Sequence, residues 1–265
     1  MRHIRFLIFR RLFQVGLLAV FAAGNYYGIT YLVRGNLSSS MFFDKIPLAD
    51  PYATLQIFLA GHVVETSVLI GALIILVFYA LFAGRAFCSW VCPINMVTDL
   101  AAWLHNKIGF GYLIKIPERT RYVILALSLV LSVLLGVAAF EWVSPIGIVQ
   151  RSVILGVTGG WMIIASIFLF DLFIMKHGFC GHICPLGAFY ALVGKKAILS
   201  VTFEAEKCTD CMKCHKTCPE PQVLHHILKV DKGFDGVRDS SCTNCGRCIE
   251  VCDDKALYFS AGLKK

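Results

Sequence analysis

Charged side chains are scarce in this sequence: they make up 16% of the 265 residues, whereas hydrophobic residues make up 57%. This composition argues against an ordinary soluble domain and indicates a membrane protein. Nucleotide-binding loops are missing too, since the sequence holds no G-x-x-x-x-G-K-[ST] loop and no G-x-G-x-x-G placed between a strand and a helix. We therefore expect chemistry that uses neither ATP nor NAD.

Histidine is missing from the centres of the long apolar stretches, although the chain has 8 histidines. A haem inside the bilayer needs axial ligands, usually His, at matching depths in the membrane. Cys211 to His215 has the letters of a haem-attachment motif, but its two cysteines belong to a longer cysteine run. We therefore expect no haem.

What the chain does have is cysteine in a strict arrangement. Two C-x2-C-x2-C-x3-C runs account for eight of the 12 cysteines, at Cys208, Cys211, Cys214 and Cys218, and at Cys242, Cys245, Cys248 and Cys252. This is the spacing of bacterial ferredoxins, in which three cysteines of one run and the fourth of the other bind each [4Fe–4S] cluster. The predicted ligand sets are Cys208, Cys211, Cys214 and Cys252 for one cluster, and Cys242, Cys245, Cys248 and Cys218 for the other.

Two other uses of these cysteines fit the pattern less well. Zinc sites more often combine C-x2-4-C pairs with histidine, and disulfides require an oxidising compartment. Asp253 stands where a ferredoxin usually has proline after the last cysteine, and we expect this change to alter the potential or the exposure of a cluster without abolishing it. Short strands are predicted at 199–203 and 256–260, within an α+β ferredoxin-like module at about 198–262.

Four apolar stretches are long enough to cross a bilayer, which takes about 20 helical residues. They run over Leu12–Val33, Val63–Ala83, Tyr122–Phe140 and Val153–Met175. The fold class predicted from them is an α-helical membrane protein, with a four-helix transmembrane domain at 1–176 and a polar tail at 177–265 that contains the ferredoxin-like module.

The basic residues follow the predicted spans, so the net charge of +8 is not read as a nucleic-acid signature. Twelve lie before the first span, between the second and third, or just after the fourth: Arg2, Arg5, Arg10, Arg11, Arg85, Lys107, Lys115, Arg119, Arg121, Lys176, Lys195 and Lys196. The opposite connections hold Arg34, Lys45 and Arg151. By the positive-inside rule, both termini and the clusters are expected on the cytoplasmic side of a bacterial inner membrane.

The remaining four cysteines form a repeated F-C-x3-C-P motif, FCSWVCP at 87–93 and FCGHICP at 179–185. Each copy ends a predicted span, which predicts two helical hairpins related as a parallel repeat. Such symmetry would bring Cys88, Cys92, Cys180 and Cys184 together, with the pair in each motif on one face of a helical turn. These thiols are expected to hold a third metal centre or to act as redox-active thiols; a purely structural role in ending the helices is the less favoured alternative.

Taken together, the paired CxxxCP motifs and the two ferredoxin runs resemble the NapH family over essentially the whole chain. These are membrane-bound ferredoxin-type quinol dehydrogenase components of periplasmic nitrate reductase systems. The resemblance implies electron transfer from quinol towards the nitrate reductase, through a periplasmic ferredoxin of the NapG type. It carries over the eight ferredoxin cysteines and the four CxxxCP cysteines, and it identifies no quinol pocket.

Other functions remain in view beside this resemblance. NosR-like proteins carry a large flavin-binding domain before a similar core, and only eleven residues precede the first predicted span here. Copper reductases and assembly factors of cytochrome oxidase maturation share the motifs and usually continue into a further domain. An assembly role, in which the clusters serve folding alone, is the non-catalytic alternative.

Candidate residues for quinol chemistry are few. Asp171 lies in the fourth predicted span and is expected either to relay protons or to pair with Lys176 or His177. His62 and Glu65 are three residues apart at the start of the second predicted span, and they are considered as a proton-release pair on one helix face. The alternative for this pair is an interfacial cap of an apolar helix. Asn25 is expected to make an interhelical hydrogen bond, with a quinone carbonyl as the alternative partner.

Overall fold

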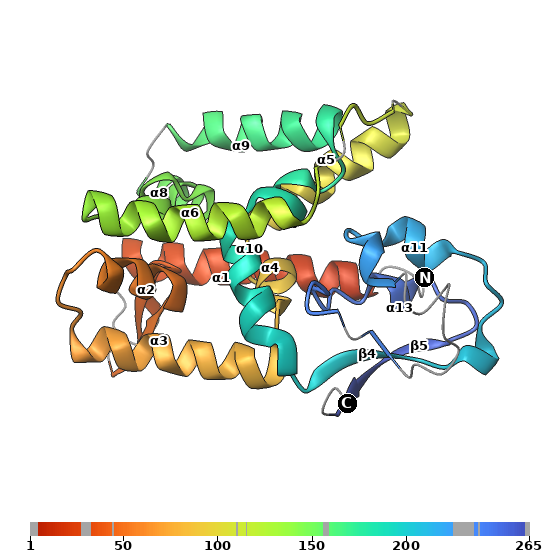
Figure 1. The fold of residues 1–265 in the computed structure, drawn as a ribbon, viewed down its shortest axis with the longest axis horizontal. Helices are drawn as coiled ribbons and strands as arrows, with labels where there is room; N and C mark the ends of the chain where they lie inside the picture. Colours follow the sequence, from red (N-terminus) through yellow and green to blue (C-terminus); the bar gives the residue numbers. More distant parts are fainter. Residues whose placement is uncertain are drawn as a thin grey trace. The chain divides into compact units, whose positions relative to one another are not determined.

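The computed structural model describes residues 5–27, 33–43, 45–109, 111–114, 116–155, 159–224, 236–237 and 239–262. The chain forms two compact units that interleave along the sequence (Figure 1). The first unit comprises Met1–Phe13, Phe78–Val91 and Tyr190–Lys265, and the second comprises Gln14–Val77 and Cys92–Phe189. The ferredoxin-like part is thus compact together with two segments that lie far ahead of it in the sequence.

Helices occupy each of the four predicted spans, with bounds that differ from the prediction. They are α1 (Arg5–Tyr26), α3 (Thr66–Phe78), α6 (Arg119–Leu135) and α9 (Gly160–Leu169). Among the described residues, α1 is the one helix that is both long and apolar enough to cross a membrane. The apolar helices at Thr66–Phe82 and Gly160–Ile174 are shorter. Residues 28–32 of the first predicted span and 156–158 of the fourth lie outside the described residues.

The ends of these helices have local causes. Gly136 ends α6 in a left-handed conformation, with φ +65°, and its N–H bonds to the Ser132 carbonyl, so the third predicted span continues past the helix. The short helix α7 (Ala139–Val143) and α8 (Pro145–Leu155) follow it. Because α3 begins at Thr66, His62 and Glu65 precede it, and the prediction that they share a helix face is wrong.

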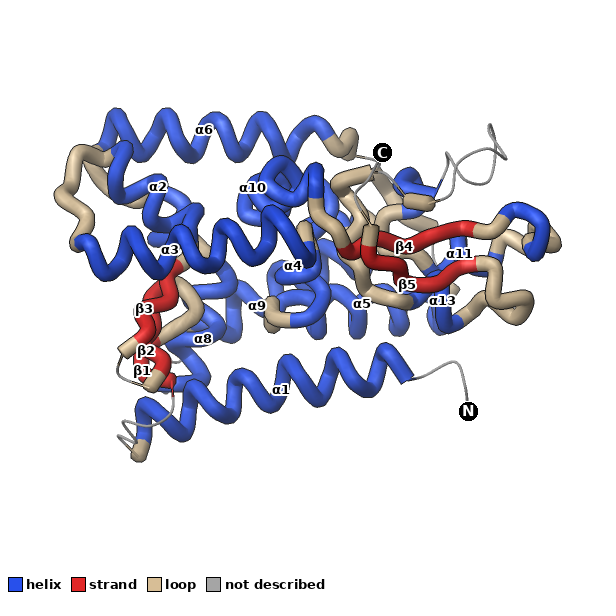
Figure 2. Tube along the Cα trace, turned by 90° about the horizontal axis from the view of Figure 1, so that it is seen from below, coloured by secondary structure: helices blue, strands red, loops and turns tan. Residues whose placement is uncertain are grey.

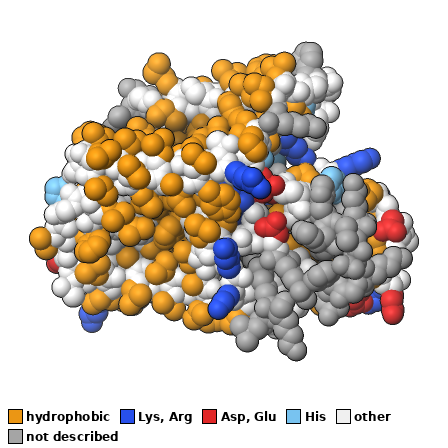
Figure 3. Space-filling model, in the orientation of Figure 1, with side chains coloured by type: hydrophobic (Ala, Val, Ile, Leu, Met, Phe, Trp, Pro, Cys, Tyr) orange, Lys and Arg blue, Asp and Glu red, His pale blue; other side chains and the backbone are white. Residues whose placement is uncertain are grey.

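Apolar side chains cover the outer faces of the same four helices. Large exposed hydrophobic residues on them include Phe9, Leu12, Leu69, Ile70, Leu73, Val123, Leu127, Leu134, Trp161 and Met162. The second unit's helical surface in Figure 3 accordingly shows hydrophobic side chains over much of its area. A soluble protein rarely leaves apolar patches of this extent uncovered, so these faces are suited to contact with lipid.

A small antiparallel sheet, β1 (Val33–Gly35), β2 (Ser39–Phe42) and β3 (Ile46–Ala49), was not expected from the sequence (Figure 2). Asn36 stabilises its first turn by accepting hydrogen bonds from the N–H groups of Ser38 and Ser39. Helix α3 packs closely on β3, because a Cβ added at Gly71 would lie 2.8 Å from the Pro47 carbonyl oxygen. Helix α2 (Pro51–Leu59) follows, capped by the Asp50 side chain.

The two halves of the predicted repeat share their order of elements. Helix α3 continues into a π-helical turn η2 (Tyr79–Ala83), then α4 (Ala86–Trp90) and α5 (Ile94–Ile108). Helix α9 continues into a π-helical turn η3 (Phe170–Ile174), then a short π-helix η4 (Phe179–Ile183) and α10 (Pro185–Val193). Each CxxxCP motif therefore follows a π-turn, a feature that often accompanies functional sites.

The ferredoxin-like part has the two strands that the sequence predicts. β4 (Leu199–Phe203) pairs antiparallel with β5 (Leu257–Ala261), with Val201 opposite Phe259. Between them lie the short helices η6 (Ala205–Lys207), α11 (Lys213–Thr217), η7 (Pro221–Leu224) and α13 (Arg247–Glu250), and η5 (Gly194–Lys196) precedes β4. The core contains Val201, Phe203, Leu224, Val237 and Leu257 together with buried or half-buried cysteines.

Candidate metal centres

The two ferredoxin cysteine runs adopt the same backbone conformation. In the first run Asp210 and Met212 have φ values of 54° and 58°, and in the second Asn244 and Gly246 have 50° and 76°. In each run these left-handed residues are the second and fourth after the first cysteine. Asn, Asp and Gly tolerate this conformation, whereas Met212 adopts it at a steric cost. Left-handed turns of this kind direct successive backbone N–H groups inward, towards an anionic group.

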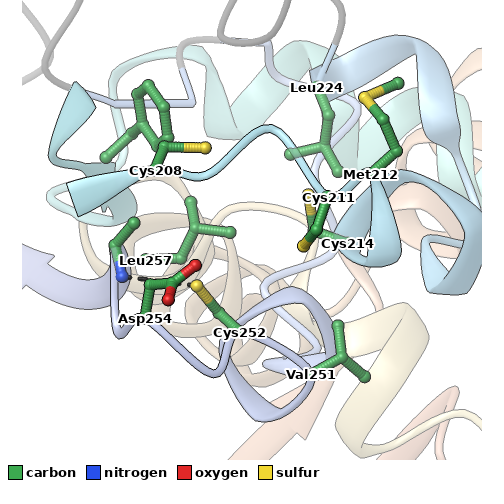
Figure 4. Close-up of a pocket in the computed structure, with 11 residues that line it drawn as sticks. Cys208, Cys211, Met212, Cys214, Leu224, Val251, Cys252, Asp254 and Leu257 are labelled. Carbon is green, nitrogen blue, oxygen red and sulfur yellow. Dashed lines mark hydrogen bonds between the residues drawn. The ribbon is translucent and has the colours of Figure 1, made fainter. Parts of the chain in front are cut away.

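The first candidate site is a pocket lined by Cys208, Cys211, Cys214 and Cys252. Its walls are apolar, from Phe203, Leu224, Val251 and Leu257, and its empty volume is about 440 Å³. Figure 4 shows the sulfurs of Cys208 and Cys252 directed into the same space, although these cysteines come from opposite ends of the module. The Cys252 sulfur also accepts a hydrogen bond from the Ala256 N–H at 3.3 Å.

The second candidate site is a separate pocket lined by Cys218, Cys242, Cys245 and Cys248. Its empty volume is about 380 Å³, and Val201, Val223 and Val237 form part of its wall. In each pocket, three cysteines of one run thus meet the fourth cysteine of the other, which is the grouping that the sequence predicts.

The chemistry of these pockets fits a cluster. None of the eight cysteines forms a disulfide. Burial raises the pKa of the Cys218 and Cys248 thiols well above the usual value, so a positively charged iron centre is what would favour their thiolate forms. Within the described part of the chain, no three His, Cys, Asp or Glu side chains gather tightly enough for a single ion. A cube needs no such gathering, because it takes one thiolate at each iron.

The CxxxCP cysteines differ from the expectation in one respect. Cys88 lies in α4 and Cys180 in η4, but Cys92 and Cys184 come after the ends of these short helices, immediately before Pro93 and Pro185. The prediction that each pair shares one face of a helical turn is therefore wrong. Cys92 and Cys184 are buried, and the Cys180 sulfur lies 3.9 Å from the Thr98 hydroxyl. Convergence of all four thiols stays a prediction.

The three candidate proton-transfer residues have different surroundings. Asp171 is fully buried in η3, and its Oδ1 accepts a hydrogen bond from the Phe179 N–H at 3.0 Å, at the start of the second motif. His62 is exposed, and its Nε2 lies 2.9 Å from the Gly136 carbonyl oxygen at the end of α6. Glu65 is exposed ahead of α3. Asp171 is thus the one of the three that adjoins a CxxxCP motif.

Sequence reasoning missed a buried polar cluster close to Asp171. His105 Nδ1 lies 2.7 Å from the Leu172 carbonyl oxygen, and the His105 ring stacks on Tyr112 with centroids 3.7 Å apart. His177 Nδ1 lies 3.8 Å from Asp99 Oδ1. Asp99 and His105 both come from α5, with Ala102 midway between them. Their separation of six residues places them about 120° apart around the helix, so no single-face spacing in the sequence would have found them.

Comparisons with known proteins agree with the two cysteine arrangements. The family described as "4Fe-4S binding domain" matches residues 64–111 and again 157–202, so each copy contains one CxxxCP motif. The family described as "4Fe-4S dicluster domain" matches residues 200–253. The two matches to one family confirm the internal sequence repeat.

Several curated proteins are similar over most of their length. "Ferredoxin-type protein NapH" of Escherichia coli (strain K12) is 43% identical over 97% of this chain and 89% of its own. The protein of the same name from Haemophilus influenzae is 44% identical over 97% of this chain and 90% of its own. "Methylamine utilization ferredoxin-type protein MauN" of Methylorubrum extorquens is 44% identical over 83% of this chain and 77% of its own. No solved structure matches the chain significantly.

Proposed function

Because the chain belongs to the NapH family of ferredoxin-type proteins, we propose that it carries electrons in a membrane from quinol towards a periplasmic nitrate reductase. The observation that carries this proposal is the pair of pockets, each lined by four cysteines from both runs. Bound [4Fe–4S] clusters would supply one-electron acceptors at the two pockets. The iron–sulfur electron-transfer role itself rests on the family matches.

The protein's part is to hold and separate the two clusters. Cys208, Cys211, Cys214 and Cys252 bind the first in the proposal, and Cys218, Cys242, Cys245 and Cys248 bind the second. Apolar side chains form part of the walls of both pockets, and a low-dielectric wall strengthens the effect of nearby charges on the reduction potential. The strand pair β4–β5 joins the two ends of the module, before Cys208 and after Cys252.

For the membrane part we propose four spans, formed by α1, α3 with η2, α6, and α9 with η3. Their exposed apolar faces support this arrangement. The short lengths of α3 and α9 favour a locally thinned bilayer around them. The distribution of Lys and Arg supports a cytoplasmic position for both termini and both clusters, in the inner membrane of a bacterium.

For quinol oxidation we propose the buried cluster around Asp171 as the proton acceptor. Quinol releases protons with its electrons, so its site needs titratable groups inside the apolar part of the protein. Asp171, His105 and His177 are such groups, and Asp171 contacts the second CxxxCP motif directly. Cys88, Cys92, Cys180 and Cys184 are proposed as a further redox or metal centre that links this region to the clusters.

The named relatives support different parts of the proposal. The MauN protein is as similar in identity as the NapH proteins, but over a smaller share of this chain. The description "ferredoxin-type protein" is common to both names, whereas the wider match to the NapH proteins supports delivery to a nitrate reductase. A periplasmic ferredoxin of the NapG type is the partner we propose for that delivery.

Anaerobic electron paramagnetic resonance of the purified protein, before and after addition of reduced quinol, tests the proposal. We expect signals of reduced clusters that a quinol-site inhibitor prevents, and slower reduction by quinol in Asp171→Asn. The reaction with dithionite is the control, since it reduces the clusters without the quinol site. Clusters that dithionite reduces and quinol does not would contradict direct quinol oxidation and would favour an assembly or copper-reducing role.

A further inference from the structure

The segment Arg85–Trp90, which carries the first cysteine of the first CxxxCP motif, is hydrogen-bonded to the loop of the second candidate cluster site. Arg85 Nη1 donates to the Ser241 carbonyl at 2.9 Å. Ser89 Oγ donates to the Thr243 carbonyl at 2.7 Å, and Trp90 Nε1 donates to the Asn244 carbonyl at 3.0 Å. The acceptors lie between residues 241 and 244, where the second cysteine run begins. Helix α4 and the residue that precedes it thus contact this loop at three points.

Arg85 also joins the two chain segments that line the second pocket. Its guanidinium pairs with the Glu220 carboxylate, and Glu220 follows Cys218 by two residues. Its other acceptor, the Ser241 carbonyl, directly precedes Cys242. The Cys218 sulfur in turn donates to the Glu220 carbonyl at 3.2 Å. Arg85 therefore lies between the lone cysteine of the second site and the run that supplies its other three cysteines.

The Arg85–Glu220 pair is buried, with side-chain exposures of 0% and 4%. Burying two charges is costly, and removing one partner leaves the other uncompensated. Neither charge is screened by solvent, so each acts strongly on any further charge placed in the adjoining pocket. A pair in this position is therefore suited to influence a redox centre.

The surrounding backbone holds the segment in place. A Cβ added at Gly194 would lie 2.3 Å from the Gly84 Cα atom, so these two segments of the chain meet at a contact that leaves no room for a side chain. The Ile198 N–H donates to the Leu81 carbonyl at 2.6 Å, just before β4. The Phe87 ring stacks on Tyr190 at 5.1 Å. The segment is thus fixed against residues 190–198, which lead directly into β4.

We propose that the Arg85–Trp90 segment couples the first CxxxCP motif to the second [4Fe–4S] cluster, and that Arg85 is a positioning residue that sets this cluster's reduction potential. The inference rests on the proposed function, because it requires a cluster on Cys218, Cys242, Cys245 and Cys248. An added electron makes a cluster more negative, so a nearby cation favours reduction and a nearby anion opposes it. The charges of Arg85 and Glu220 therefore act on the potential in opposite directions.

The test is a redox titration of the purified full-length protein, followed by electron paramagnetic resonance, with a set of charge variants. In Arg85→Gln, the carboxylate of Glu220 is left uncompensated, and we expect the second cluster's potential to fall. In Glu220→Gln, the guanidinium is left uncompensated, and we expect that potential to rise. At a fixed ambient potential each change should alter the ratio of reduced to oxidised cluster at least tenfold, which corresponds to about 59 mV for one electron.

Two variants separate the charge effect from a general disturbance. The double variant Arg85→Gln/Glu220→Gln removes both charges, and Arg85→Lys keeps the positive charge, so both should return the potential towards that of the unaltered protein.

Lys207→Gln is the matched control, because Lys207 directly precedes Cys208 of the first site but its side chain is 57% exposed. Solvent screens such a charge, so we expect little change in either potential. Cys245→Ser identifies which signal belongs to the second cluster.

The outcomes distinguish this inference from the proposed function. An unaltered protein that binds fewer than two clusters overturns the proposed function and the inference with it. Two clusters with no shift, or with shifts of the same sign in Arg85→Gln and Glu220→Gln, overturn the inference alone. If a single variant loses the second cluster, its reduction potential cannot be measured. The potentials of Arg85→Lys and of the double variant are then compared with that of the unaltered protein. Normal potentials in both support the inference, and loss of the second cluster in both overturns the electrostatic role.

Discussion

The two candidate cluster sites have the same backbone conformation, but different side chains join the chain segments that form them. At the first site Lys213 pairs with Asp253 at 2.5 Å, and Thr209 donates to Asp254 at 2.6 Å, so surface side chains within the module join its two segments. At the second site the joining residue is the buried Arg85, which comes from outside the module. At the position where a ferredoxin usually has proline, Asp253 therefore provides one half of an ion pair instead of a rigid ring.

The two sites also differ in how far their cysteines are exposed to solvent. Cys211 of the first run is exposed, whereas Cys245, its counterpart in the second run, is buried. The second loop also lies against the start of α1, where the Phe6 and Leu7 N–H groups donate to Glu250. The comparison teaches that equal cysteine spacing produces unequal sites. We expect the first cluster to be open to solvent and to an external redox partner, and the second to communicate with the membrane repeat.

Removing the fourth ligand of each site should have the largest effect on cluster content, and it tests directly whether the two sites are separate. If the ligands cross between the runs, Cys252→Ser damages the first cluster and Cys218→Ser damages the second. Each variant should lose about half of the iron while keeping the other cluster's signal. Iron analysis and electron paramagnetic resonance measure this. Loss of the first cluster in Cys218→Ser would contradict the crossed ligand sets.

Exchanging the left-handed residues should have the next largest effect. In Gly246→Ala, an added Cβ would lie 2.8 Å from the Phe6 ring at φ +76°, so we expect a cost of about 1–2 kcal/mol from the backbone alone. Met212→Gly relieves a left-handed methionine and should stabilise the first loop by about 1 kcal/mol. Thermal loss of each cluster signal measures both effects. Destabilisation by Met212→Gly would show that the methionine's packing outweighs its backbone strain.

Unequal exposure predicts unequal lifetimes. During slow oxidation in air, or with a chelator present, the first cluster should disappear before the second, because Cys211 is open to solvent. The amplitudes of the two signals over time measure the order of loss. Equal rates would mean that exposure of this cysteine does not limit attack.

The smallest effect is expected at the surface pair of the first site. Asp253 raises the pKa of Lys213 above its usual 10.5 by a hydrogen bond and by charge. A raised lysine pKa contributes stability below the usual value, which is lost as the pH rises through the raised one. Asp253→Asn should therefore change neither cluster potential measurably near neutral pH, and any change in stability should vanish in strong alkali. A large shift of the first potential at neutral pH would contradict the screening argument.

The sequence predicts those parts that spacing or local pattern specifies. Cysteine spacing grouped all eight ferredoxin cysteines as the pockets group them, and the strands at 199–203 and 256–260 were predicted within one residue. The β1–β3 sheet was missed, because its short strands lie in an apolar context without strong alternation. Arg85 was read only as a topogenic charge, since its partner Glu220 lies 135 residues away in sequence. His62 and Glu65 lie outside the helix because hydrophobicity alone does not mark the residue at which a helix starts.

The ion pair of Arg85 and Glu220 also imposes an order on biosynthesis. Translation produces the cation 135 residues before the anion that neutralises it, and the cysteines of the second run follow later still. The segment that carries Arg85 and the first CxxxCP motif is therefore synthesised before its counter-charge exists. The second site, which needs Arg85, Cys218 and the second cysteine run together, is accordingly complete only after Cys248 has been synthesised.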